Sequence, residues 1–198
     1  MMAIGAVVSI SACGQQSAMS PAAQPPPAGG PGITADEAVR QDETTRWASG
    51  YCTTVGGLVQ TLTTMPAVDP SSPESAARTS SELLAVMIGG LDRTIDGLGE
   101  LGPAPGQEGD LARQNVSADL TRIRERAVAT KADVDETPPS SEDGREAIGA
   151  VKLPLDALAG LRLLKGFDAT PALDTATRRA PSCADLAKRD PAAEPPPR

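Results

Sequence analysis

The most informative absence in this 198-residue sequence is histidine, which does not occur at all. Histidine is the commonest general base and a common metal ligand, so catalytic triads and metal sites that depend on it are excluded. The sequence also contains no G-x-S-x-G elbow and no phosphate-binding Walker loop. Gly97-Leu98-Gly99 falls late in an expected helix rather than after a strand, so no dinucleotide-binding loop forms there. We therefore expect that the protein is not an enzyme and has neither catalytic residues nor a cofactor.

Positive charge is also scarce, because 18 Lys and Arg residues stand against 26 Asp and Glu residues, for a formal net charge of -8. No basic patch with interleaved aromatic residues is present, so we expect no nucleic-acid partner. Four carboxylates near one expected helix start suit the positive end of the helix dipole: Asp36, Glu37, Asp42 and Glu43. Another acidic group, Asp133, Asp135 and Glu136, lacks the spacing of a calcium-binding EF-hand loop, and we expect no metal site.

Aromatic residues make up only 2% of the chain, so the core must be built mainly from aliphatic side chains. The only Trp and the only Tyr, Trp47 and Tyr51, lie one helical turn apart. Two interpretations of this pair remain open. The rings could line a pocket for a small hydrophobic or carbohydrate ligand, or they could be core residues whose polar atoms find partners inside the protein.

The segment 1–12, MMAIGAVVSISA, is a short apolar run without a charged residue. It is too short to cross a bilayer, which takes about 20 apolar residues, but it fits the core of a signal peptide. The following sequence, Ile10-Ser11-Ala12-Cys13-Gly14, resembles the bacterial lipobox. The resemblance implies that Cys13 carries a diacylglyceryl group and becomes the mature N-terminus. Because no Lys or Arg precedes the apolar run, we expect the true translation start to lie upstream.

Proline, glycine and small polar residues dominate the sequence after Cys13. We therefore interpret 13–32 as the lipidated cysteine and a tether, whose extended geometry, at roughly 3 Å per residue, reaches up to about 60 Å. The segment 33–189 is expected to be the folded domain. Residues 190–198 are expected to be a disordered tail.

Hydrophobic residues recur at three- and four-residue steps in four stretches of the folded domain, which predicts four α-helices. The first begins after the capping residue Thr34 and ends before Pro66, and the second runs from Ser72 to the break at Gly102. The third covers about 108–136, and the fourth runs from Ser141 to Gly166.

Three further local features refine this prediction. Gly56-Gly57 in the first helix indicates that another helix crosses closely there. Pro154 should kink or split the fourth helix near Lys152. Thr170-Pro171 opens a short additional helix, and a last turn is expected around Cys183. The predicted fold class is all-α: an antiparallel four-helix-type bundle with an additional short C-terminal helix and disordered N- and C-terminal tails.

The chain contains three cysteines, and lipidation of Cys13 leaves Cys52 and Cys183 as a pair. Two thiols in an oxidising compartment usually form a disulfide, so we predict a Cys52–Cys183 bond. Closing so long a loop stabilises the fold by at most about 5 kcal/mol in the chain-entropy account. A redox-active pair is the alternative, but the two residues lack the C-x-x-C arrangement of such pairs.

The whole chain resembles small lipobox-containing lipoproteins of the actinobacterial and mycobacterial cell envelope. The resemblance rests on the lipobox, the Pro/Gly tether, the Trp47-x4-Cys52 spacing and Pro181-Ser182-Cys183. It implies anchoring at the outer face of the cytoplasmic membrane and no established activity for that group.

Two hypotheses for function follow from this resemblance and from the expected bundle. The first is a non-enzymatic interaction or structural module, which is anchored to the membrane through the lipid on Cys13 and binds an unknown envelope protein. It requires an exposed apolar surface, for which the region of Pro154 is a candidate. The alternative is a carrier or sensor that binds a small hydrophobic ligand between the helices, which requires a cavity beside Trp47 and Tyr51.

Overall fold

The computed structural model describes residues 32–189, and α-helix is the only regular secondary structure in that range. The expectations for the signal peptide, for Cys13, for most of the tether and for the tail 190–198 lie outside the described residues. The helices are α1 (Ala35–Thr63), α2 (Pro73–Glu100), α3 (Gln107–Glu136), α4 (Glu142–Ala150), α5 (Lys152–Ala159), α6 (Pro171–Arg179) and α7 (Pro181–Arg189).

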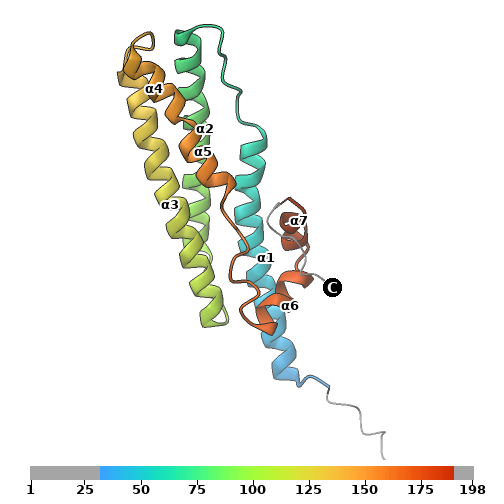
Figure 1. Cartoon of the computed structure of the whole chain (residues 1–198). Helices are drawn as coiled ribbons and strands as arrows, with labels where there is room; N and C mark the ends of the chain where they lie inside the picture. Colours follow the sequence, from blue (N-terminus) through green and yellow to red (C-terminus); the bar gives the residue numbers. More distant parts are fainter. Residues whose placement is uncertain (1–31, 190–198) are drawn as a thin grey trace, which may run out of the picture. The chain divides into compact units, whose positions relative to one another are not determined.

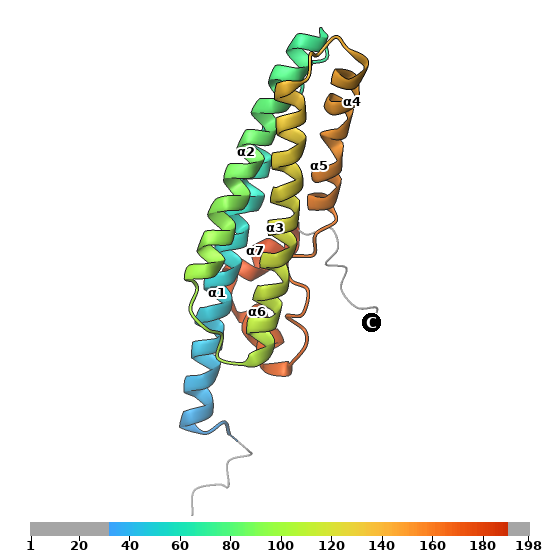
Figure 2. The same cartoon turned by 90° about the vertical axis from the view of Figure 1, so that its left-hand side faces the viewer.

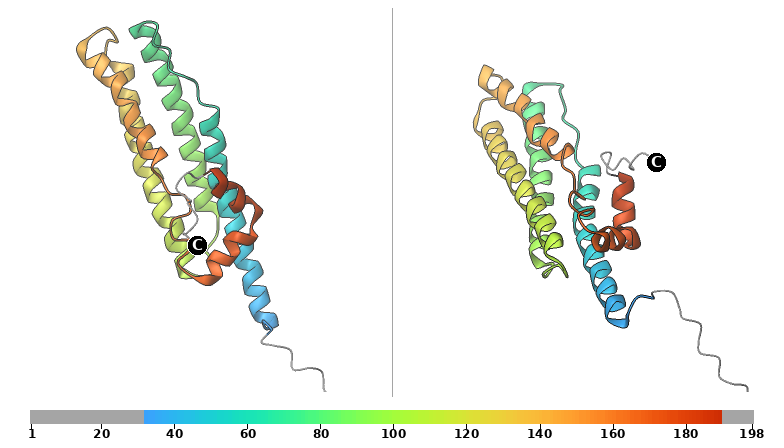
Figure 3. Two further views of the ribbon diagram at one scale, coloured as in Figure 1. Left: turned by 45° about the vertical axis from the view of Figure 1, so that its right-hand side comes forward. Right: turned by 60° about the horizontal axis from the view of Figure 1, so that its bottom comes forward.

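The first three helices run up, down and up beside one another, and α4 and α5 together run back down along α3 (Figures 1 and 2). The predicted antiparallel all-α bundle is therefore confirmed. The most extensive helix contact joins α2 to α3, while α4 also touches α2. The helices α6 and α7 instead pack against α1, as both views of Figure 3 show.

Side-chain caps mark the helix starts that the sequence predicts. The hydroxyl of Thr34 accepts a hydrogen bond from the backbone N–H of Glu37, and Ser72, Ser141 and Thr170 cap α2, α4 and α6 in the same way. Each hydroxyl satisfies an amide that has no partner within its own helix. These interactions fix where the chain turns from one helix into the next.

The core is a continuous set of aliphatic side chains from every long helix. Fully buried members include Val55 and Leu58 of α1, Leu84 and Leu91 of α2, and Leu120 of α3. Each buried leucine or valine contributes about 1.5–3 kcal/mol relative to the exposed side chain. The apolar stripes read from the sequence therefore point inward.

The predicted close crossing at Gly56-Gly57 is wrong, because a Cβ atom on either residue would meet nothing within 4 Å. The close approach of α2 to α1 lies instead at Gly97 and Gly90 of α2. A Cβ on Gly97 would lie 2.9 Å from the Thr54 methyl carbon, and one on Gly90 would lie 3.0 Å from that of Thr61. Gly90 and Gly97 of α2, rather than Gly56 and Gly57 of α1, allow the two backbones to approach.

The predicted fourth helix is divided in two, as expected from Pro154, with the break at Val151 between α4 and α5. The expectation that it continues to Gly166 is wrong, because α5 ends at Ala159 and Gly160 forms its C-cap. Residues 160–170, which we call the strap, cross in turns to the start of α6. Because the strap is not helical, its side chains Leu163 and Phe167 can both be buried. The expected last turn around Cys183 is a full helix, α7.

Two glycines of α4 offer a matched test of this packing. A Cβ on Gly144 would overlap the backbone carbonyl of Pro138, whereas one on Gly149 would meet nothing within 4 Å. We predict that Gly144→Ala lowers the free energy of unfolding by about 2 kcal/mol or more, because backbone atoms must move. Gly149→Ala should raise it by up to about 1 kcal/mol through helix propensity.

Urea denaturation of both variants measures these changes. Equal stabilisation by the two substitutions would contradict the close contact of Gly144 with Pro138.

Candidate functional site

All three aromatic residues of the chain gather at one place beside α1. Trp47 and Tyr51 project from α1, and Phe167 reaches them from the strap. The ring centroids of Trp47 lie 5.9 Å from Tyr51 and 6.0 Å from Phe167, and those of Tyr51 and Phe167 are 4.5 Å apart. Contacts at such distances contribute beyond simple burial, so this cluster fixes the strap on α1.

The polar atoms of the cluster are satisfied within the protein. The Tyr51 hydroxyl donates a 2.7 Å hydrogen bond to the backbone carbonyl of Leu163, and Trp47 Nε1 donates one of 3.2 Å to that of Gly102. Burial raises the pKa of Tyr51, which keeps its hydroxyl protonated as a donor. This arrangement matches the interpretation of the pair as core residues.

A surface cleft of about 330 Å³ reaches the edge of Trp47, which is 9% exposed. Its apolar lining comes from Trp47, from the loop before α3 and from the start of α6, and the lining includes Ala104, Pro105, Ala172 and Leu173. Tyr51 does not line this cleft, because its side chain is fully buried. Of the two residues predicted to line a pocket, the structure therefore places only Trp47 at a cleft wall.

Three polar side chains at the rim of the Trp47 cleft, Glu37, Arg40 and Gln41, are already paired. Glu37 binds the Arg40 guanidinium at 2.5 Å and accepts a hydrogen bond from the Gln41 amide, and these contacts lower the pKa of Glu37. The Gln41 side-chain oxygen in turn accepts a hydrogen bond from Arg179 of α6. A ligand here would have to displace or accommodate this ordered row.

A second cleft, also of about 330 Å³, lies between α3 and the strap. Glu108, at the start of α3, borders both clefts. The strap contributes Leu161, Arg162 and Lys165 to this cleft. The sequence predicts a helix as far as Gly166, which covers most of the strap, and does not indicate this cleft.

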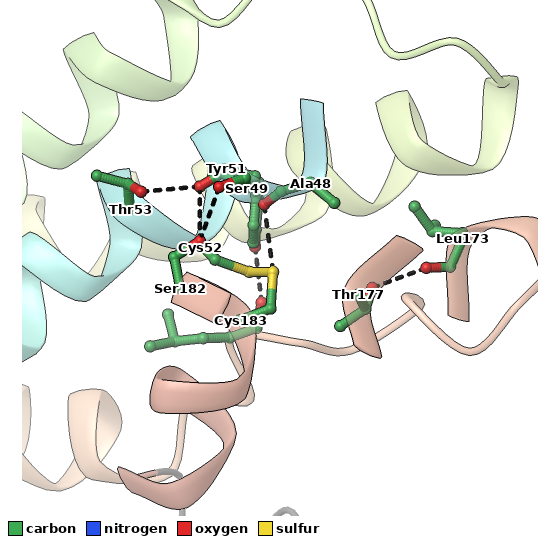
Figure 4. The surroundings of a disulfide bond; sticks show 10 residues. Ala48, Ser49, Tyr51, Cys52, Thr53, Leu173, Thr177, Ser182 and Cys183 are labelled. Atoms are coloured by element: carbon green, nitrogen blue, oxygen red, sulfur yellow. Dashed lines mark hydrogen bonds between the residues drawn. A yellow bond between two sulfur atoms is a disulfide. The ribbon is translucent and has the colours of Figure 1, made fainter. Parts of the chain in front are cut away.

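The predicted disulfide joins Cys52 of α1 to Cys183 of α7, with Cα atoms 5.0 Å apart (Figure 4). Both residues are buried. Beside the bond, the Ser182 hydroxyl donates a 3.0 Å hydrogen bond to the backbone carbonyl of Ser49, so a polar contact supports the covalent one. The bond therefore holds α7 against α1 at the residue that directly follows Tyr51.

Phe167 is the residue of the aromatic cluster that the sequence pattern does not indicate. Only the composition could have indicated it. The chain has three aromatic residues, so each of them is a candidate to pack against the other two in the core. Among residues 32–189, no cluster of three or more acidic or cysteine side chains could hold a metal ion. In the same range, no helix combines the length and hydropathy needed to cross a bilayer.

The disulfide can be tested by its effect on stability. It closes a loop across a sequence separation of 131 residues. Reductant should therefore lower the free energy of unfolding by up to about 5 kcal/mol, because the reduced unfolded chain gains conformational freedom. Urea denaturation with and without reductant measures this change.

The double variant Cys52→Ala/Cys183→Ala is the control, since its stability should not respond to reductant. Equal stability of the oxidised and reduced wild-type protein would contradict a structural role for the bond.

In comparisons with known proteins, no family model, no curated protein and no solved structure matches this chain. The residues and geometry described above are therefore the basis for proposing a function.

Proposed function

We propose that this protein is a lipid-anchored module of the cell envelope, held at the outer face of the cytoplasmic membrane by a diacylglyceryl group on Cys13. Its folded domain acts as an interaction or structural module without enzymatic activity. The lipobox and the tether are the sequence features on which the anchor rests.

The buried pairing of Cys52 with Cys183 carries the proposed location. Such bonds form and persist outside the cytoplasm, where thiols are not kept reduced. The pairing also uses both cysteines that remain after lipidation of Cys13. A compartment that oxidises this pair is thus consistent with an exported, anchored chain.

The packing favours an interaction module over a carrier with an internal ligand. Tyr51 is fully buried against the strap, and aliphatic side chains continue the core along the bundle. The clefts lie at the surface, where a partner can reach them. The region of Pro154 offers less apolar surface than expected, because Pro154 is buried and Leu153 is the exposed residue beside it.

Mass spectrometry of protein extracted from its own host's membranes tests the anchor. We predict a diacylglyceryl group on an N-terminal Cys13 and a two-dalton gain in mass when the disulfide is reduced. The Cys13→Ser variant should leave the membrane fraction, because one polar side chain replaces the lipid attachment.

The variant should retain the helical circular dichroism spectrum of the wild type, which separates loss of anchoring from loss of folding. A wild-type chain that is unlipidated at Cys13 would contradict the proposed location and anchor.

A further inference from the structure

Two cations of the strap have no ionic partner in the described domain. Arg162 and Lys165 are exposed, and neither forms a salt bridge with another residue of 32–189. Arg40, Arg113, Arg122 and Arg124 each contact a carboxylate, whereas Arg46, Arg126 and Lys152, like the two strap cations, form no salt bridge within 32–189. In a chain whose net charge is -8, these two cations lie three residues apart. The carboxylate of the strap, Asp168, is exposed and lies outside the lining of the cleft beside them.

Both cations border the cleft of about 330 Å³ between the strap and α3. The opposite wall on α3 contains the apolar residues Leu111, Ala112 and Val116 beside the polar residues Glu108, Asn115 and Asp119, and Leu111 is 49% exposed. Leu161 of the strap adds a partly buried aliphatic side chain. The cleft therefore combines apolar side chains with positive charge at its rim.

The carboxylates of the same cleft do not cancel this charge. Asp119 contacts the guanidinium of Arg122, which lies one turn further along α3. Glu108 is the remaining acidic residue of the lining, and it sits at the boundary with the Trp47 cleft. Two cations thus face one carboxylate that has no salt bridge within 32–189.

The strap is held in place from two sides. The Tyr51 hydroxyl of α1 donates a hydrogen bond to the backbone carbonyl of Leu163, and Phe167 packs on Tyr51 and Trp47. Gly166 has a positive φ of 88°, and a Cβ there would lie 3.4 Å from Ala112 of α3. The cations therefore project from a segment whose backbone is ordered before any ligand arrives, which reduces the entropic cost of binding.

We propose that this cleft binds a single-chain anionic amphiphile. Arg162 and Lys165 contact the anionic head group, and the acyl chain lies along Leu111, Val116 and Leu161. A free fatty acid and a lysophospholipid with an anionic head share this chemistry. The proposal goes beyond the interaction module described above and does not depend on lipidation of Cys13.

Titration calorimetry of the full, unlipidated chain with dodecanoate tests the proposal, below the concentration at which dodecanoate forms micelles. Dodecanoyl lysophosphatidylglycerol is the second probe. Binding of dodecanoate points to a free fatty acid as the ligand, and binding of the second probe points to a lysophospholipid. Uncharged monododecanoyl glycerol and inorganic phosphate test the acyl chain and the head group separately. We expect saturable binding of an anionic amphiphile. Monododecanoyl glycerol and inorganic phosphate should each bind at least about tenfold more weakly.

Three variants locate the binding. Arg162→Gln/Lys165→Gln should weaken binding about tenfold through loss of charge-assisted contacts, and Leu111→Gln should weaken it through loss of apolar contact. Lys152→Gln is the matched control, since Lys152 is an exposed α5 cation outside the cleft lining. It should leave the affinity unchanged. Circular dichroism confirms that each variant folds.

Three results would overturn the proposal. The first is no saturable binding of either anionic probe. The second is that monododecanoyl glycerol or inorganic phosphate binds as tightly as the anionic amphiphile. The third is unchanged affinity in the Arg162→Gln/Lys165→Gln variant.

Discussion

The strap, α6 and α7 together form the C-terminal segment, and its attachment to α1 is the constraint on which the candidate sites depend. The Cys52–Cys183 bond fixes α7 on α1, and Phe167 holds the strap against Trp47 and Tyr51. These contacts join residues more than a hundred positions apart, so the loop-closure cost of bringing them together is large. Helices α2 and α3 have their own extensive contact, which does not involve these residues. The attachment therefore shapes the clefts rather than the bundle as a whole.

Each cleft has one wall on the C-terminal segment and one on a long helix. The Trp47 cleft uses the start of α6, and the second cleft uses the strap opposite α3. Their chemistry differs, because the rim of the first is paired through Glu37 and Arg40, whereas the strap leaves Arg162 and Lys165 without salt bridges in 32–189. This difference is why we assign an anionic ligand to the second cleft alone.

Local features of the fold could be predicted from the sequence, and contacts between distant segments mostly could not. Thr34, Ser72 and Ser141 act within one helical turn, so their capping roles follow from local spacing. The disulfide followed from counting cysteines, without geometry. Gly56-Gly57 was misleading, since whether a glycine faces a neighbouring helix depends on rotation of the helix in the bundle. The strap was missed because the apolar residues Leu161, Leu163 and Leu164 also suit a helix, and only packing of Phe167 on α1 decides against it.

Hydrogen–deuterium exchange with and without reductant tests the central claim most directly, namely that the disulfide maintains the attachment of the C-terminal segment to α1. Reduction should speed exchange in the strap, α6 and α7, because local opening no longer has to overcome a covalent link. Exchange in α2 and α3 should speed up less, by no more than the loss of global stability allows, since their mutual contact does not involve the bond. Unchanged exchange in the strap, α6 and α7, or an equal increase in all helices, would contradict the account.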